Sequence, residues 1–235
     1  MRDLRGQGVT VAVIDSGVNG GHPHVGAVAG GVRIELSGEV SEDYLDRLGH
    51  GTAVFAAIQE KAPGAELYAV RVFTDRLKTS ARALVAAIDW AAERRVRVVN
   101  LSLGTLREEH AAMLEGAVER LGEAGGIVVA AETAGGQRWW PGSLPGAVGV
   151  VMDEELPRGC VVVGGGRVGR GGGGPAAELV AAAPYPRPIP GVPRERNLSG
   201  ISFAVANVAG MLARVVEGWE GPLTREACLQ ALRVG

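Results

Sequence analysis

The stretch VTVAVIDSG, residues 9–17, decides how this chain folds. It begins with Val9–Ile14, a short Val-rich apolar run that predicts a strand buried on both faces. Asp15 follows at the end of the run, and Ser16-Gly17 leads the chain out of the strand. Strands buried on both faces are typical of parallel sheets covered by helices. The stretch therefore predicts a parallel sheet with a carboxylate at the carboxyl end of one strand.

Further apolar runs of the same kind alternate with helical patterns. The runs are Leu67–Phe73, Val96–Leu101, Ile127–Ala131, Ala147–Met152 and Cys160–Val163. Apolar residues spaced three and four apart predict one helix from Thr79, as N-cap, to Arg95 and another over Glu108–Glu123. This alternation predicts a single α/β domain over residues 1–235, a mostly parallel twisted sheet with helices on both faces in three layers.

The last third of the chain adds two helices and two loops. A helix is predicted from Ile201 through Val216, and its small, apolar first turn suits burial through the core. A short terminal helix begins at the Thr224 cap. The glycine-rich residues 164–174 and the proline-rich Tyr185–Pro193 are predicted surface loops, and we place no domain boundary there.

Composition excludes several classes of protein. The chain is 46% hydrophobic and 21% charged with a net charge of −2, so neither nucleic acid nor a membrane surface is an expected partner. Cys160 and Cys228 fit no zinc spacing and no disulfide framework, and both are predicted to be buried as small apolar residues. We expect no signal peptide, propeptide or transmembrane segment, and therefore a cytoplasmic protein. The sequence carries no signal for an oligomeric state.

Three residues could together carry nucleophilic chemistry. Asp15 ends a strand, His50 lies between two glycines and opens a predicted helix just before the apolar segment Ala53–Ile58, and Ser202 opens the buried helix. Taken singly, an aspartate at a strand end or a lone histidine is more often structural. Together the three supply an orienting carboxylate, a general base and a nucleophile, in one of the chain orders in which such triads occur.

The sequence resembles the subtilase family of serine proteases. The segments VAVIDSGVNGGHPHV, GHGTAVFAAI, ELYAVRVF, VVNLSLG and SGISFAVANVAGML are similar to successive signature blocks of that family, in order, over nearly the whole chain. The resemblance implies that Asp15, His50 and Ser202 form a catalytic triad. It also implies that Ser102-Leu103-Gly104 pairs with an extended peptide or protein substrate.

That resemblance implies a serine endopeptidase or a specialised peptide-processing protease that works through an acyl-enzyme on Ser202, with no cofactor. Only Gln59–Glu66 stands where many secreted relatives insert a longer calcium-binding loop, so we expect no calcium or other metal. Ala206-Asn207, where the family commonly has Pro-His, is interpreted as a change in helix packing.

One departure from the family pattern bears on the chemistry. In subtilases an asparagine amide completes the oxyanion hole, whereas here Thr133 and Ala134 stand at the Gly-Asn pair. Losing one such donor lowers kcat by about 10²–10³-fold, so we expect a slow enzyme or a replacement donor. Thr133 and Gln137 are the candidates, since an ionised Glu132 would repel the oxyanion. The alternative is an impaired pseudoprotease that binds extended peptides.

Three other motifs receive plainer interpretations. Gly164-x-Gly166-x-x-Gly169 fits a dinucleotide fingerprint, but no helical pattern follows it, so a loop is the better interpretation. His22 and His24 lack a third metal ligand at a recognised spacing and are interpreted as structural. The pair Trp139-Trp140 is either a wall of a substrate site or a packed corner.

Overall fold

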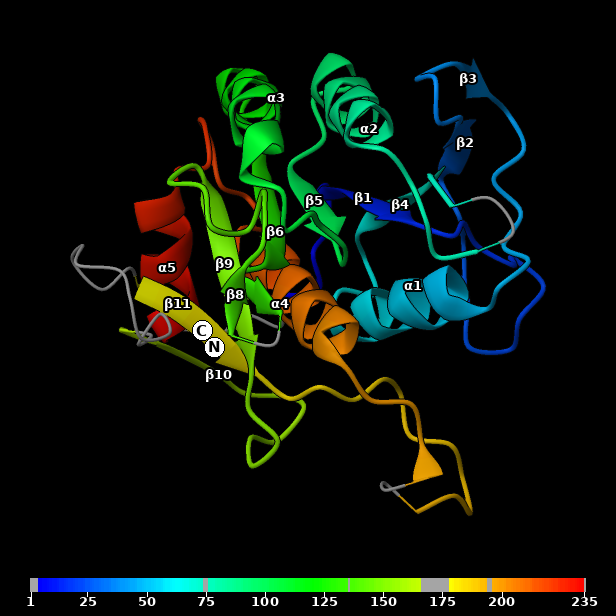
Figure 1. Ribbon diagram of the computed structural model, residues 1–235. Coiled ribbons are helices and arrows are strands. Elements are labelled where there is room, and N and C mark those ends of the chain that lie inside the picture. The colour runs from blue at the N-terminus through cyan, green and yellow to red at the C-terminus, as the bar shows by residue number, and fades with distance from the viewer. Residues whose placement is uncertain (1–3, 74–75, 135, 166–177, 194–195, 235) are drawn as a thin grey trace.

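The computed structural model describes residues 4–73, 76–134, 136–165, 178–193 and 196–234. Its main sheet has the strand order β10-β11-β9-β6-β5-β1-β4-β2-β3, and helices cover both faces (Figure 1). The strands are β1 (Thr10–Asp15), β2 (Gly30–Ile34), β3 (Val40–Ser41), β4 (Glu66–Arg71), β5 (Val98–Leu101), β6 (Ile127–Ala131), β9 (Ala147–Met152), β10 (Val161–Gly165) and β11 (Glu178–Ala182), and β7 (Thr133–Ala134) and β8 (Gln137–Arg138) form a separate hairpin. The helices are α1 (His50–Lys61), α2 (Ala81–Glu93), α3 (Ala111–Glu123), α4 (Ile201–Val215) and α5 (Arg225–Val234), with a 3₁₀ turn at Glu108–His110.

The sheet confirms the predicted fold class. Strand β1 lies inside it, between β4 and β5, and pairs in parallel with both. Within this sheet, as far as the structure describes it, only the outermost pairings, of β2 with β3 and of β10 with β11, are antiparallel. The apolar runs predicted as strands form β1, β4, β5, β6 and β9, whereas the short strands β2, β3 and β11 were not predicted.

The run Cys160–Val163 was wrongly predicted to be a strand buried on both faces. It forms most of β10, which pairs only with β11 at the edge of the sheet, and the Val162 side chain is 51% exposed. Cys160 is likewise exposed rather than buried. An edge strand has a neighbour on one side only, so fewer elements cover it. Cys228 is buried in α5 as predicted, and burial raises the pKa of its thiol to about 12.

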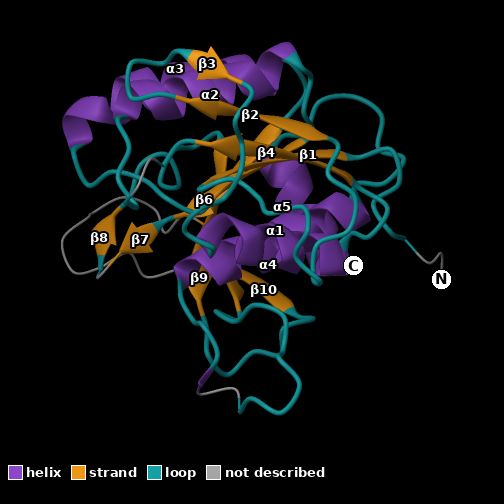
Figure 2. Cartoon of the chain, turned by 90° about the vertical axis from the view of Figure 1, so that its right-hand side faces the viewer, coloured by secondary structure: helices purple, strands orange, loops and turns teal. Residues whose placement is uncertain are grey.

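Two hydrophobic clusters fill the spaces on either side of the sheet. Helices α2 and α3 pack over one face, and α1, α4 and α5 pack over the other (Figures 1 and 2). Helix α4 lies against β5, β6, β9 and β11, and ten of its fifteen residues are buried. This confirms the prediction that the helix opened by Ile201 passes through the core.

Two helix starts depend on hydroxyl caps. The N-cap of α2 is Ser80 rather than the predicted Thr79, because the Ser80 hydroxyl accepts a hydrogen bond from the Ala83 backbone N–H at 3.0 Å. The same hydroxyl donates to the Leu36 carbonyl at 2.8 Å, which ties α2 to the segment after β2. At α5 the Thr224 hydroxyl accepts from the Ala227 N–H at 3.2 Å, as predicted.

The end of α4 holds the N-terminal segment. The Glu217 carboxylate accepts hydrogen bonds from the backbone N–H groups of Arg5, Gly6 and Gln7 at 2.7, 2.8 and 3.1 Å. None of the helices in the described ranges is long and apolar enough to cross a membrane. The predicted glycine-rich loop and the dinucleotide fingerprint fall mostly on residues 166–177, outside the described residues.

Candidate active site

The candidate site lies where the strand order of the sheet reverses. The chain leaves β1 to form β2, β3 and β4 on one side, and then returns to place β5 on the other side. Ligands of open α/β sheets bind at such a point, beyond the carboxyl ends of the strands. Asp15 is the last residue of β1 and Ser102 directly follows β5, so both predicted site residues belong to this crevice.

Asp15 and His50 form a short hydrogen bond. The distance between Asp15 Oδ1 and His50 Nδ1 is 2.7 Å, and the same oxygen accepts from the Ser16 backbone N–H at 2.7 Å. Asp15 is fully buried, and its second oxygen has no hydrogen-bond partner among the described residues. A carboxylate that holds Nδ1 fixes the ring and leaves Nε2 as the nitrogen available for proton transfer.

The glycines on either side of His50 allow this placement. Gly49, the N-cap of α1, has φ of 82°, a left-handed conformation that side chains other than glycine adopt rarely. A Cβ on Gly51 would lie 2.3 Å from the Gly17 carbonyl oxygen, too close for any side chain. The first turn of α1 therefore packs directly on the chain leaving β1, which brings His50 to Asp15.

Opposing effects set the pKa of His50. Burial alone lowers the pKa of the imidazole, but the hydrogen bond to Asp15 and the negative charges of Asp15 and Asp46 outweigh it and raise the pKa above its usual value. From α4 the ring faces the uncharged Phe203, with 6.0 Å between ring centroids. The imidazole is thus a stronger base than a free histidine.

Ser202 lies in the first turn of α4, half-buried beside the end of β5. Its hydroxyl donates to the Ser102 carbonyl at 3.4 Å, and the Ser102 hydroxyl donates to the Ser202 carbonyl at the same distance. Asn100, buried in β5, donates its amide to the Ser102 hydroxyl at 3.0 Å. Within the described part of the chain the Ser202 hydroxyl makes no hydrogen bond to His50, a bond that often tightens only when substrate binds.

The helix that carries Ser202 also supplies an electrostatic environment. Backbone N–H groups in the first turn of a helix have no partner within the helix, and the helix dipole is positive there. An anion that develops beside the Ser202 hydroxyl would be stabilised by both.

The hairpin β7–β8 occupies the predicted oxyanion region. Thr133 pairs with Arg138, and Ala134 pairs with Gln137. Thr133 is half-buried, whereas Gln137 and Arg138 are exposed. The role of Thr133 or Gln137 as a replacement donor to the oxyanion stays a prediction.

Glu132, just before this hairpin, is buried. Burial raises the pKa of its carboxyl group, and the Arg138 charge and the Ser143 hydroxyl lower it by less. The Ser143 hydroxyl also donates to the Glu132 carbonyl at 2.9 Å, and one carboxyl oxygen of Glu132 has no partner among the described residues.

The predicted substrate strand Ser102-Leu103-Gly104 continues from β5 toward a packed corner. Thr105 and Trp140 exchange two backbone hydrogen bonds of 3.0 Å, and a Cβ on Gly104 would lie 2.5 Å from the Trp140 carbonyl oxygen. Trp139 packs against one hydrophobic cluster and Trp140 against the other. Of the two interpretations of the tryptophan pair, the packing favours the corner.

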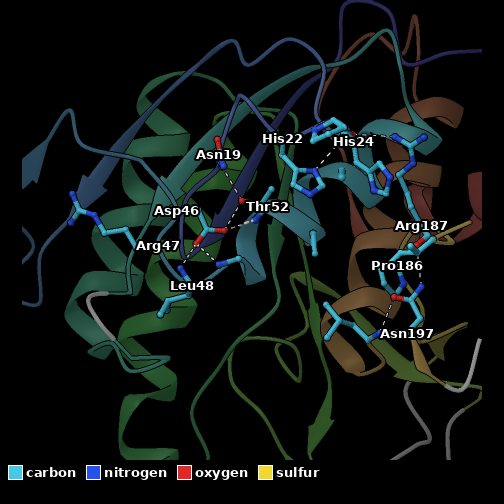
Figure 3. Close-up of a pocket in the computed structure, with 16 residues that line it drawn as sticks. Asn19, His22, His24, Asp46, Arg47, Leu48, Thr52, Pro186, Arg187 and Asn197 are labelled. Atoms are coloured by element: carbon cyan, nitrogen blue, oxygen red, sulfur yellow. Dashed lines mark hydrogen bonds between the residues drawn. The ribbon is translucent and has the colours of Figure 1, made fainter. Parts of the chain in front are cut away.

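Two pockets include residues that are close in sequence to the candidate site residues. One, of about 690 Å³, includes Gly49 next to His50 and Leu198 four residues before Ser202 (Figure 3). Another, of about 630 Å³, includes Gly104 and Thr105.

Two histidines on the wall of the larger pocket contact each other. The rings of His22 and His24 meet edge to face at 5.2 Å between centroids, and His22 Nδ1 accepts from the His24 backbone N–H at 3.1 Å. The residues that the structure describes include no group of three or more potential metal ligands. These contacts, between two residues of the same loop, are consistent with the structural role that the sequence predicted for His22 and His24.

Asp46 belongs to the site and was not predicted from the sequence. Its carboxylate is buried, accepts hydrogen bonds from the first turn of α1 and contributes to the charge at His50. The one signal was an acidic residue shortly before a predicted helix start, a pattern typical of helix caps in general.

Comparisons with known proteins identify relatives of this chain. The sequence model of the subtilase family matches residues 6–234. The chain is 32% identical over 225 residues to a thermostable alkaline protease of Halalkalibacterium halodurans, covering 91% of this chain and 58% of that protein. It is 34% identical over 165 residues to Subtilisin Savinase of Lederbergia lenta, covering 66% of this chain and 59% of that protein.

A solved structure supports the fold. The crystal structure of a cold adapted subtilisin-like serine proteinase superposes with a TM-score of 0.68 at 20% identity, covering 98% of this chain and 82% of that chain. The two curated relatives are longer, and the chain spans less than two thirds of either.

Proposed function

The chain belongs to the subtilase family, and from that premise we propose that it is a serine protease that hydrolyses peptide bonds through an acyl-enzyme on Ser202. The observation that carries the proposal is the 2.7 Å bond between the buried Asp15 carboxylate and His50 Nδ1. The bond supports the proposal because a hydrolytic triad requires a carboxylate that holds Nδ1 of its histidine.

The chemical steps follow from the positions of these groups. The Ser202 hydroxyl turns from the Ser102 carbonyl toward His50 and attacks the scissile carbonyl carbon, while His50 Nε2 takes the hydroxyl proton. The carbonyl oxygen becomes an oxyanion near the first turn of α4. His50 then gives the proton to the leaving amine, and a water molecule hydrolyses the ester by the same steps.

The proposed substrate is an extended segment of a peptide or protein. It would pair with the backbone of Ser102-Leu103-Gly104, which places its scissile bond near Ser202. The pocket beside Gly104 and Thr105 would take side chains on the acyl side, and the pocket beside Gly49 would take side chains on the leaving side.

A finer proposal concerns the rate. Because alanine has no side-chain donor, Ala134 leaves the oxyanion with fewer hydrogen bonds, which lowers kcat by about 10²–10³-fold relative to a site with that donor. Such a rate suits a protease that processes few substrates.

A second candidate function is peptide binding without hydrolysis. Two observations favour it: the missing donor at Ala134, and the Ser202 hydroxyl that bonds to the Ser102 carbonyl rather than to His50. In that case the strand Ser102-Leu103-Gly104 would capture a peptide and release it intact.

A fluorophosphonate probe separates the two functions, since it reacts only with an activated serine. We expect covalent labelling of the wild-type protein and none of the Ser202→Ala variant. Mass spectrometry of the labelled peptide would identify the modified residue. If folded wild-type protein stays unlabelled throughout pH 6–9, the protease proposal fails and peptide binding is favoured.

A further inference from the structure

Asp46 is a second buried carboxylate beside the triad. It is 9% exposed, and its two oxygens accept five hydrogen bonds from one small region. Those from Leu48 and Thr52 can be followed in Figure 3. Oδ1 accepts from the Ser16 hydroxyl and from the Leu48 and Gly49 N–H groups, each at 2.9 Å. Oδ2 accepts from the N–H of Thr52 at 2.8 Å and from its hydroxyl at 2.6 Å.

These bonds reach both sides of the Asp15–His50 pair. Leu48, Gly49 and Thr52 enclose the start of α1, where His50 lies. On the other side, the Ser16 hydroxyl donates to Asp46 and accepts from the Gly51 N–H at 2.8 Å, while the Ser16 N–H donates to Asp15. Ser16 therefore joins the two carboxylates to each other and to the residue after His50.

We propose that Asp46 is a positioning residue for the proposed reaction: it holds His50 against Asp15 through Ser16 and the start of α1, and it provides the second negative charge facing the His50 ring. The role rests on the proposed function, since His50 is the base only if the chain is a protease. A group that accepts from the helix start alone would be a cap, and the Ser16 link to the strand that ends in Asp15 goes beyond a cap.

Asp46 carries its charge at the pH where His50 acts. Burial alone raises the pKa of the Asp46 carboxyl, but its hydrogen bonds to Thr52, Leu48 and Ser16 lower it below the usual range. The charged groups that act on His50 are Asp15 from β1 and Asp46 from the loop before α1, while α4 presents the uncharged Phe203. Both charges favour the protonated imidazole.

The test is an NMR titration of the His50 ring in protein labelled at histidine, with the four histidine signals assigned by means of a His50→Gln variant. This readout requires no turnover, so it stays interpretable if fluorophosphonate labelling fails. Asp46→Asn is expected to lower the pKa of His50 by roughly half a unit or more, because a nearby negative charge is lost. An unchanged pKa in folded Asp46→Asn protein would overturn the charge role.

Glu42→Gln is the matched control. It removes the same charge from an exposed position in the same segment, and the pKa of His50 should stay at its wild-type value. An equal fall in both variants would mean that net charge rather than Asp46 acts on the ring, which also contradicts the proposal.

Ser16→Ala tests positioning without a change of charge, and it decides the case if Asp46→Asn does not fold. The pKa of His50 should stay close to wild type, while the Nδ1 proton exchanges with water several-fold faster because the ring is held less firmly. Exchange at the wild-type rate would overturn the positioning role. In the active enzyme, Asp46→Asn should also move the acidic limb of kcat/KM to lower pH, a shift that a purely structural defect would not produce.

Discussion

The two halves of the candidate site are built differently. The base half, consisting of Asp15, Ser16, Asp46 and His50, is joined by hydrogen bonds of 2.7–2.9 Å between mostly buried groups. The oxyanion half consists of the first turn of α4 and the hairpin β7–β8, and the hairpin has two paired residues in each strand. The base half is fixed by the sheet and by α1, whereas the oxyanion half depends on a small hairpin.

This difference indicates where the rate is determined. The base half already holds His50 against Asp15 before substrate binds, so most changes within it should reduce activity. If Ala134 stands at the donor position as proposed, the oxyanion half is the one in which a single substitution could increase activity. We therefore expect opposite responses from the two halves.

The largest expected effect comes from breaking the base half. Asp15→Asn preserves the size of the side chain but removes the charge and stabilises the wrong imidazole tautomer, so kcat should fall by about 10⁴-fold. Steady-state kinetics with a peptide ester as substrate would measure the decrease in kcat. A decrease of less than tenfold in folded protein would mean that Asp15 does not orient His50.

A smaller effect, of the opposite sign, is expected in the oxyanion half. Ala134→Asn supplies a side-chain amide, which should raise kcat by about 10²-fold with little change in KM. The same ester assay measures it, with Ala134→Leu as a control that adds size but no donor. If Ala134→Asn leaves the rate unchanged or lowers it, another group already occupies the donor position.

The smallest effect is a pH dependence that belongs to the base half alone. His50 must be neutral to accept the proton, and its pKa is raised, so the acidic limb of kcat/KM should lie above pH 6.5. Ala134→Asn should leave the limb in place, because the amide does not titrate. A limb at or below pH 6.5 would contradict the observed Asp15–His50 environment.

Stability should change with pH in the opposite direction. The pKa of His50 is higher in the folded than in the unfolded chain, so its contribution is fully present below about pH 6.5 and is lost as the pH rises through the folded value. The contribution of His50 can be measured as the difference in melting temperature between the wild type and a His50→Gln variant across this pH range. As the pH rises through the pKa of His50 in the folded chain, activity should increase while the contribution of His50 to stability is lost.

The sequence predicted those parts of the molecule that depend on local patterns. Val-rich runs indicated β1, β5 and β6, and the glycines around His50 indicated the start of α1, because these signals lie within a few residues. The N-cap of α2 was wrong by one position, since Thr79 and Ser80 are both good caps and a contact with Leu36 favours the second.

The parts that were missed depend on distant contacts. Strand β2 begins with two glycines and has neither an alternating nor a continuous apolar pattern, so only its pairing with β4 identifies it. Asp46 looks like an ordinary loop aspartate until Ser16, thirty residues earlier, is placed against it. The exposure of Cys160 follows from the position of β10 at the edge of the sheet, which composition does not encode.

The attachment of the N-terminal segment to Glu217 has a practical consequence for handling the protein. Residues 5–7 are held just beyond the last turn of α4, and Ser202 lies in its first turn, so the length of a fifteen-residue helix, about 22 Å, separates them. A chain tethered to a resin through its amino end would be anchored away from the crevice. In protein immobilised in this way, the crevice of the candidate site should therefore stay accessible to peptides in the solution that flows over the resin.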